Sequence, residues 1–137
     1  MNILIIDGQG GGMGAQLVAG LKQKMPEAEI TAVGTNTIAT QAMLKAGADH
    51  GATGENAVIV GCRKADVISG PIGIVIADSL FGEITPNMAL AVAQSDAERV
   101  LLPMNICSNF IVGVEKQPTA KLIEAAVEKI DTLKNTI

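Results

Sequence analysis

The sequence predicts an α/β fold, a doubly wound and mostly parallel sheet of about five strands with helices on both faces. Residues 3–7 form an aliphatic run that stops at a glycine, which is typical of a strand buried on both faces. Apolar residues then recur at helical spacing before the next aliphatic run begins. Because strands and helices keep alternating over 137 residues, we expect one Rossmann-like domain that spans residues 1–137.

The first part of the chain predicts a right-handed strand–helix–strand unit. After the first strand, residues 12–25 carry an apolar side chain at every fourth position, and Pro26 ends this helix. Residues 29–33 are the second expected strand. A second helix follows at 38–46, and Gly47 stands where a left-handed residue is needed to end it.

The later part of the chain continues the alternation with shorter elements. Proline and glycine residues mark the expected ends of the helices and strands, and Pro86 stands at the preferred first position of a helix. The expected elements are a loop at 47–54, a helix to about residue 64, a strand at 67–69, helices at 74–80 and 85–94, strands at 99–103 and 109–114, and a last helix that begins at Pro118. The link between the last two strands is so short that we expect them to be antiparallel.

Composition narrows the class of protein. Hydrophobic residues make up 48% of the chain, without Trp or Tyr, so we expect an aliphatic core. The formal charge of −4 and the scarcity of aromatics argue against a nucleic-acid partner. Apolar stretches too short for a membrane span predict a soluble protein, with the cytoplasm as the default location. Cys62 and Cys107 lack metal-ligand spacing and are expected to be packing residues.

A glycine-rich turn directly after the first strand is the main functional signal. Glycines 8, 11 and 14 are spaced G-x-x-G-x-x-G, and Gly10, Gly12 and Ala15 also satisfy G-x-G-x-x-A. Such a turn lets the backbone approach a ligand while amide groups at the start of the next helix point at its phosphates. A tight turn without a ligand is the alternative. The predicted phosphate-binding residues are Gly8, Gln9, Gly10, Gly11, Gly12, Met13 and Gly14.

The residues around this turn favour a dinucleotide, either NADP or NAD. A mononucleotide P-loop would need Lys and Ser or Thr after the last glycine, where this chain has Ala15 and Gln16. The second strand ends in Gly34, Thr35 and Asn36, without the acidic residue that grips the ribose of NAD. This pattern somewhat favours NADP, although the usual Arg is also missing.

Further site residues are expected at the same edge of the sheet, because ligands of open parallel sheets bind outside the carboxyl ends of the strands. A second strand-to-helix turn could touch a ribose or a diphosphate, or could simply start a helix. Asn105 could bind a carboxamide, or could form a turn. The residues of the second turn are Gly70, Pro71, Ile72 and Gly73.

Four titratable residues have alternative interpretations. Asp7 either accepts hydrogen bonds from loop amides, which we favour, or holds Mg²⁺. His50 could transfer protons, but no partner residue is evident, and a solvated loop position is the simpler interpretation. Asp78 and Glu83 are expected to be helix caps or surface charges.

Four segments together resemble a bacterial family of short Rossmann-like proteins that is described only as a domain of unknown function. They are residues 5–14, 34–36, 51–57 and 70–74. The resemblance covers nearly the whole chain and implies no activity. The glycine loop alone is similar to that of the dihydrodipicolinate reductases, which use NADH or NADPH. Their substrate domain has no counterpart here, so their reaction is not carried over.

These observations lead to one hypothesis and two alternatives. The first is a nucleotide-binding domain that acts as a sensor or as part of a larger assembly, because a phosphate loop is present without a visible catalytic constellation. The second is a small oxidoreductase whose site is completed in a homodimer, with the apolar stretch 74–94 as the dimer surface. The third is a structural subunit without a ligand.

Overall fold

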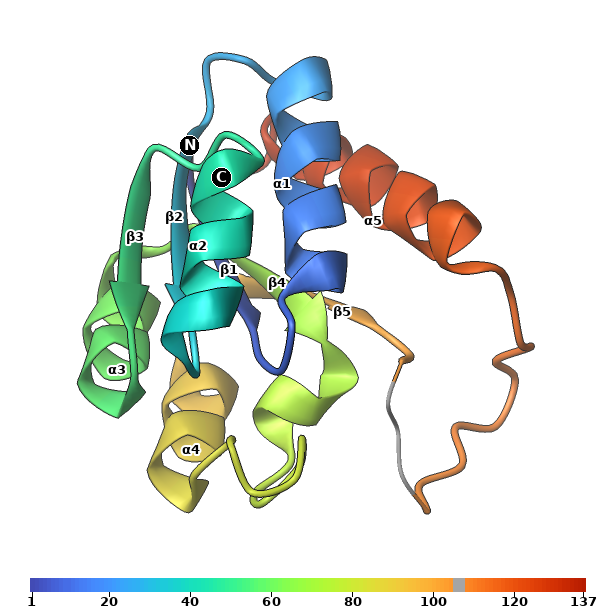
Figure 1. Ribbon diagram of the computed structural model, residues 1–137. Helices are drawn as coiled ribbons and strands as arrows, with labels where there is room; N and C mark the ends of the chain where they lie inside the picture. Colours follow the sequence, from blue (N-terminus) through green and yellow to red (C-terminus); the bar gives the residue numbers. More distant parts are fainter. Residues whose placement is uncertain (105–107) are drawn as a thin grey trace.

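The computed structural model describes residues 1–104 and 108–137 and contains one parallel sheet of five strands. The spatial order is β3-β2-β1-β4-β5, and every neighbouring pair is parallel (Figure 1). The strands are β1 (Asn2–Asp7), β2 (Glu29–Gly34), β3 (His50–Thr53), β4 (Val67–Pro71) and β5 (Glu98–Leu102). The predicted fold class is thereby confirmed.

Helices cover both faces of the sheet. One face carries α1 (Gly12–Lys24), α2 (Thr37–Lys45) and α5 (Thr119–Leu133), and the other carries α3 (Glu55–Lys64) and α4 (Pro86–Gln94) (Figure 1). None of these helices is long and apolar enough to cross a bilayer, among the residues that the structure describes.

The central strand β1 links the two halves of the core. Side chains alternate along a strand, so Ile3 and Ile5 pack under α1 and α5, whereas Leu4 and Ile6 pack under α3 and α4. All four are almost completely buried. A strand buried on both faces is continuous in apolar residues, which is why the sequence identified it easily.

Three sequence-based expectations about secondary structure are wrong. Residues 50–53, expected in a loop, form the edge strand β3. The strand has only four residues and lacks the run of β-branched or aromatic side chains that predicts a strand. The helix expected at 74–80 is only a short 3-10 helix (Ile72–Val75) followed by turns. Residues 109–114, expected to form a strand, adopt turns and irregular backbone, and Phe110 and Val112 are 93% and 99% exposed. A run of apolar residues does not by itself establish that its backbone joins a sheet.

The strand order places a topological switch point beside β1. The chain moves outward from β1 to β3 on one side of the sheet and then returns to place β4 and β5 on the other side. Connections that leave the carboxyl ends of β1 and β4 therefore diverge, and this is where open α/β sheets bind ligands. The glycine-rich turn leaves β1 at this point and lies at the lower end of the sheet in Figure 1.

The start of α4 offers a test of the fold. The Thr85 hydroxyl accepts a hydrogen bond from the Met88 amide and donates to Glu55 on α3. Replacement of Thr85 by Ala is expected to lower the free energy of unfolding by about 1 kcal/mol, as loss of an N-cap usually does. Urea unfolding measures this change. Thr85→Ser keeps the hydroxyl and should stay close to the wild type; an equal loss in both variants would contradict the capping role.

Candidate functional site

Asp7 at the end of β1 shapes the glycine-rich turn. Its Oδ1 accepts a hydrogen bond from the Gly8 amide at 2.8 Å, and its Oδ2 accepts one from the Gly14 amide at 2.7 Å. Burial raises the pKa of Asp7, the two amides lower it, and the nearby carboxylate of Glu83 raises it further. The expected role of Asp7 as an acceptor for loop amides is confirmed.

Three of the glycines are required by close packing. Gly11 has φ of 73°, and a Cβ there would lie 2.6 Å from the Ala39 Cα on α2. A Cβ at Gly14 would lie 2.6 Å from the Met43 sulfur and 2.8 Å from the Asp7 Cβ. A Cβ at Gly8 would meet the side chains of Thr35 and Glu83. The G-x-x-G-x-x-G spacing therefore serves helix packing and loop closure.

The other two glycines face open space. Nothing lies within 4 Å of the positions that a Cβ would take at Gly10 and Gly12. Within the described part of the chain, the amides of Gly10, Gly12 and Met13 have no hydrogen-bond acceptor, whereas the Gly11 amide donates to the Gly8 carbonyl. The start of α1 has neither a side-chain cap nor an acidic residue in its first turn. These amides are available to an anion.

The turn after β2 lies against the glycine loop, as the sequence predicted. The Thr35 amide donates to the Asp7 carbonyl at 3.0 Å. The Asn36 side chain caps α2 through the Ala39 amide, and its Nδ2 donates to the Gln9 carbonyl at 2.9 Å. The predicted residues Gly34, Thr35 and Asn36 are thus brought together with Gly8–Gly14.

Glu83 also belongs to this site, although the sequence assigned it to a cap or the surface. Its Oε1 accepts a hydrogen bond from the Gln9 amide at 2.6 Å, and its Oε2 accepts one from the Asn36 Nδ2 at 2.8 Å. The contact spans 74 residues of sequence and depends on the turns that replace the expected helix at 74–80. No local pattern could have indicated it.

The second predicted turn is less open than expected. Gly70 and Pro71 are buried residues of β4, and a Cβ at Gly70 would lie 2.2 Å from the Ile6 carbonyl oxygen on β1. Ile72 and Gly73 belong to the 3-10 helix, where Gly73 is buried. All four lie at the carboxyl end of β4, and their contact with a ligand stays a prediction. Asn105 and Cys107 lie outside the described residues.

Other titratable groups lie away from this edge. His50 begins β3, and its Nε2 is 2.7 Å from Oε1 of Glu29 at the start of β2, so it stands at the amino end of the sheet. Cys62 is buried in the core, and burial raises the pKa of its thiol to about 11, which agrees with a packing role. Neither group can act at the glycine loop.

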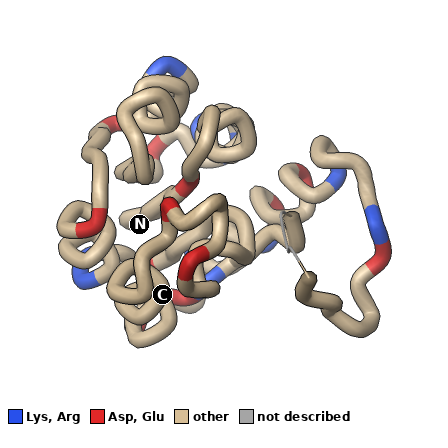
Figure 2. Tube along the Cα trace, turned by 60° about the horizontal axis from the view of Figure 1, so that its bottom comes forward, with Lys and Arg blue, Asp and Glu red and all other residues tan. Residues whose placement is uncertain are grey.

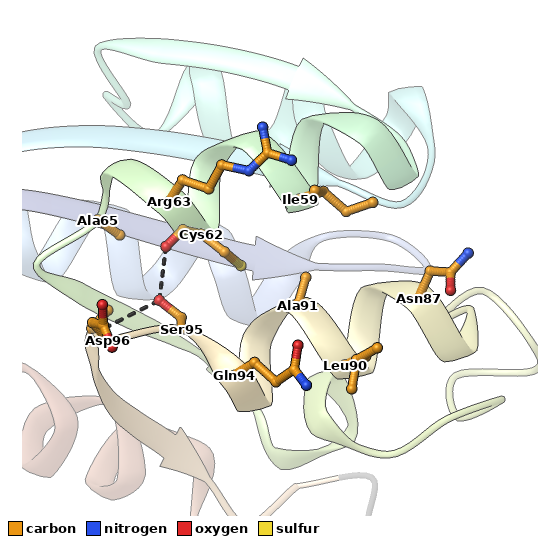
Figure 3. A pocket seen from close by; sticks show the side chains of 11 residues that line it. Ile59, Cys62, Arg63, Ala65, Asn87, Leu90, Ala91, Gln94, Ser95 and Asp96 are labelled. Carbon is orange, nitrogen blue, oxygen red and sulfur yellow. Dashed lines mark hydrogen bonds between the residues drawn. The ribbon is translucent and has the colours of Figure 1, made fainter.

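The principal hollows of the surface are also elsewhere. One, of about 600 Å³, lies between α3 and α4, where the Ser95 hydroxyl donates a hydrogen bond to the Cys62 carbonyl (Figure 3). A second, of about 440 Å³, lies beside α3 over the amino half of the sheet, and a third, of about 360 Å³, lies on α2. None of the three includes a residue of the loop 8–14.

The electrostatic setting of the loop is acidic. Figure 2 turns the lower end of the molecule toward the viewer, and acidic positions appear near the middle of that view. Asp7 and Glu83 both lie at the loop, and no Lys or Arg side chain pairs with either of them among the described residues. An anion that binds here must depend on backbone and amide donors.

A family model covers residues 2–135 and is described as a domain of unknown function, DUF3842. The chain belongs to this family. This membership confirms the resemblance to an uncharacterised family and assigns no activity. No curated protein matches the chain.

The chain is also similar to one solved structure, a dodecameric FMN-dependent UbiX-like decarboxylase from Escherichia coli O157:H7. The identity is 16%, the TM-score is 0.46, and the match covers 99% of this chain and 94% of the other. The cofactor named there is FMN, which contradicts the predicted NADP or NAD. The end of β2 agrees with this correction, because Gly34, Thr35 and Asn36 include neither the acidic residue that binds the ribose of NAD nor the Arg that accommodates the 2′-phosphate of NADP.

Two glycines of the loop should respond oppositely to alanine. Gly11→Ala must accommodate a left-handed backbone and a contact with α2, so we expect it to lower the free energy of unfolding by more than about 2 kcal/mol. Gly12→Ala meets open space at the start of a helix and should be neutral or stabilising by up to about 1 kcal/mol. Urea denaturation distinguishes them, and similar values for both would contradict the packing assignment.

Asp7 should give stability a specific pH dependence. Asp7→Asn places an amide nitrogen against a loop N–H group and is expected to cost about 1–3 kcal/mol. Because the folded pKa of Asp7 lies above 3.8, the folded protein holds this proton more tightly than the unfolded chain does. The contribution of Asp7 is therefore fully present below pH 3.8 and falls as the pH rises through the folded pKa.

Urea unfolding of both proteins over a pH series checks this expectation. The difference in unfolding free energy between wild type and Asp7→Asn should shrink as the pH rises above 3.8. A difference that grows over the same range would show that the pKa of Asp7 is lowered in the folded state.

Proposed function

We propose that this protein binds the phosphate group of a small nucleotide at the start of α1, as a sensor or as a component of a larger assembly. The observation that carries the proposal is the set of three amides without acceptors, at Gly10, Gly12 and Met13. They stand at the positive end of a helix of 13 residues, which favours an anion at this position.

The position of these amides in the fold supports the same function. They follow β1 at the point where the strand order reverses, next to the carboxyl end of β4. Gly10 and Gly12 leave the approach to the amides open, and packing gives no reason for glycine at either position. A turn that served only to connect β1 to α1 would not need these two glycines.

Titration calorimetry with FMN, AMP, ATP and inorganic phosphate tests the proposal. We expect saturable binding of at least one nucleotide and weaker binding of phosphate alone, because the base and sugar add apolar contacts. A ligand at a concentration of about 100 times its Kd should also stabilise the protein by about 2.7 kcal/mol. The absence of both heat and thermal stabilisation with all four compounds would refute the function.

A charge placed at Gly12 gives a sharper test. Gly12→Asp adds a carboxylate to the first turn of α1, where it should preserve or raise stability but compete with the ligand for the same amides. We expect nucleotide affinity to fall by about tenfold or more, because like charges meet at close range. Gly12→Asn has nearly the same shape without the charge and should retain most of the affinity. Equal losses in the two variants would contradict an anion at these amides.

A further inference from the structure

Glu83 stands where a ligand anion would be held. Its carboxylate accepts hydrogen bonds from the Gln9 amide at 2.6 Å and from the Asn36 Nδ2 at 2.8 Å. These two donors therefore already bind an anionic group of the protein itself. Both bonds are charge-assisted, which makes them strong for their kind. The Gln9 amide and the Asn36 side-chain amide are therefore arranged so that one carboxylate can accept from both.

The Thr35 hydroxyl is a third possible donor near the Glu83 carboxylate. The Thr35 hydroxyl oxygen is buried and lacks a hydrogen-bond partner among the described residues. It faces the same point as Glu83, because a Cβ at Gly8 would lie 2.6 Å from the Thr35 Oγ1 and 2.7 Å from the Glu83 Oε1. A buried hydroxyl without a partner costs free energy, so the carboxylate of Glu83 fills the site incompletely.

The segment that carries Glu83 is held in an unfavourable backbone conformation. Asp78, Leu80 and Phe81 have φ of 66°, 55° and 57°, in the left-handed region that disfavours residues other than glycine. Phe81 is 97% exposed at the tip of the segment. Backbone of this kind is typical of segments that exchange between two arrangements at functional sites.

We propose that Gln9, Thr35 and Asn36 form an inner anion site, that Glu83 occupies it in the free protein, and that the ligand's phosphate displaces Glu83. This inference rests on the proposed function and adds donors from Gln9, Thr35 and Asn36 to the amides of Gly10, Gly12 and Met13 at the start of α1. In the bound state the phosphate accepts hydrogen bonds from the Gln9 amide, the Asn36 Nδ2 and the Thr35 hydroxyl. The Glu83 side chain turns away toward solvent, while Leu80 and Ile84 of the same segment stay buried in the core.

Binding of AMP and inorganic phosphate to the wild type and three variants, followed by NMR on ¹⁵N-labelled protein, tests this site. Glu83→Gln removes the competing charge and should bind both probes about fivefold more tightly or better. Glu98→Gln makes the same charge change at the amino end of β5 and should bind like the wild type. Thr35→Val loses only an unpartnered hydroxyl, so it should keep its Tm and bind AMP at least about threefold more weakly.

The results separate this inference from the proposed function. Binding to the wild type with equal or weaker binding to Glu83→Gln would overturn the displacement of Glu83 and leave nucleotide binding intact. Unchanged affinity of Thr35→Val would overturn the inner anion site. If neither the wild type nor any variant bound either probe, this inference would be overturned, and the proposed function itself would be refuted where FMN and ATP also gave neither heat nor thermal stabilisation.

A measurement in a protein that retains Glu83 covers the case in which Glu83→Gln fails to fold. The chain contains no Trp, so Phe81→Trp places a single fluorophore at the tip of segment 76–84. Saturation with AMP should lower the tryptophan anisotropy, because the tip loses its tether when Glu83 leaves Gln9 and Asn36. An anisotropy that stays constant at saturation would overturn the displacement.

Discussion

The shape of the glycine-rich turn between β1 and α1 depends on the carboxylate of Asp7. By accepting hydrogen bonds from the Gly8 and Gly14 amides, this one side chain fixes both ends of the turn that joins β1 to α1. Burial of a carboxylate is costly, and the raised pKa of Asp7 reflects that cost. The donors at each end of the turn offset it.

Once the turn is fixed, its glycines divide into two groups with different physical reasons. Gly8, Gly11 and Gly14 have no room for a side chain, because α2, Thr35 and Asp7 itself approach too closely. Gly10 and Gly12 have ample room. A glycine motif is usually interpreted as a single ligand signal. Here the regularly spaced glycines serve packing, and the two between them carry the argument for a ligand.

Glu83 gives the site its second state. Its carboxylate accepts from the Gln9 amide and the Asn36 side chain, so these donors are arranged for an anionic group. The Thr35 hydroxyl has no hydrogen-bond partner among the described residues, so the carboxylate does not satisfy every donor nearby. The acidic surroundings oppose any anion that arrives from solvent. In the proposed displacement, the Glu83 carboxylate leaves as the ligand's phosphate enters, which removes part of the electrostatic repulsion. The affinity for the phosphate and the rearrangement of the site then depend on the same residue.

The sequence by itself determined the fold class, the glycine turn, and the proximity of residues 34–36 to that turn. Apolar periodicity and helix punctuation are local, and parallel strands place their carboxyl ends at one edge. The sequence could not place β3, the irregular segment 109–114 or Glu83, because a strand forms only where a neighbouring strand pairs with it, and a contact across 74 residues depends on the whole fold. Only the tertiary structure decided which glycines face open space and which carboxylate bonds to the loop, since both depend on distances between elements remote in sequence.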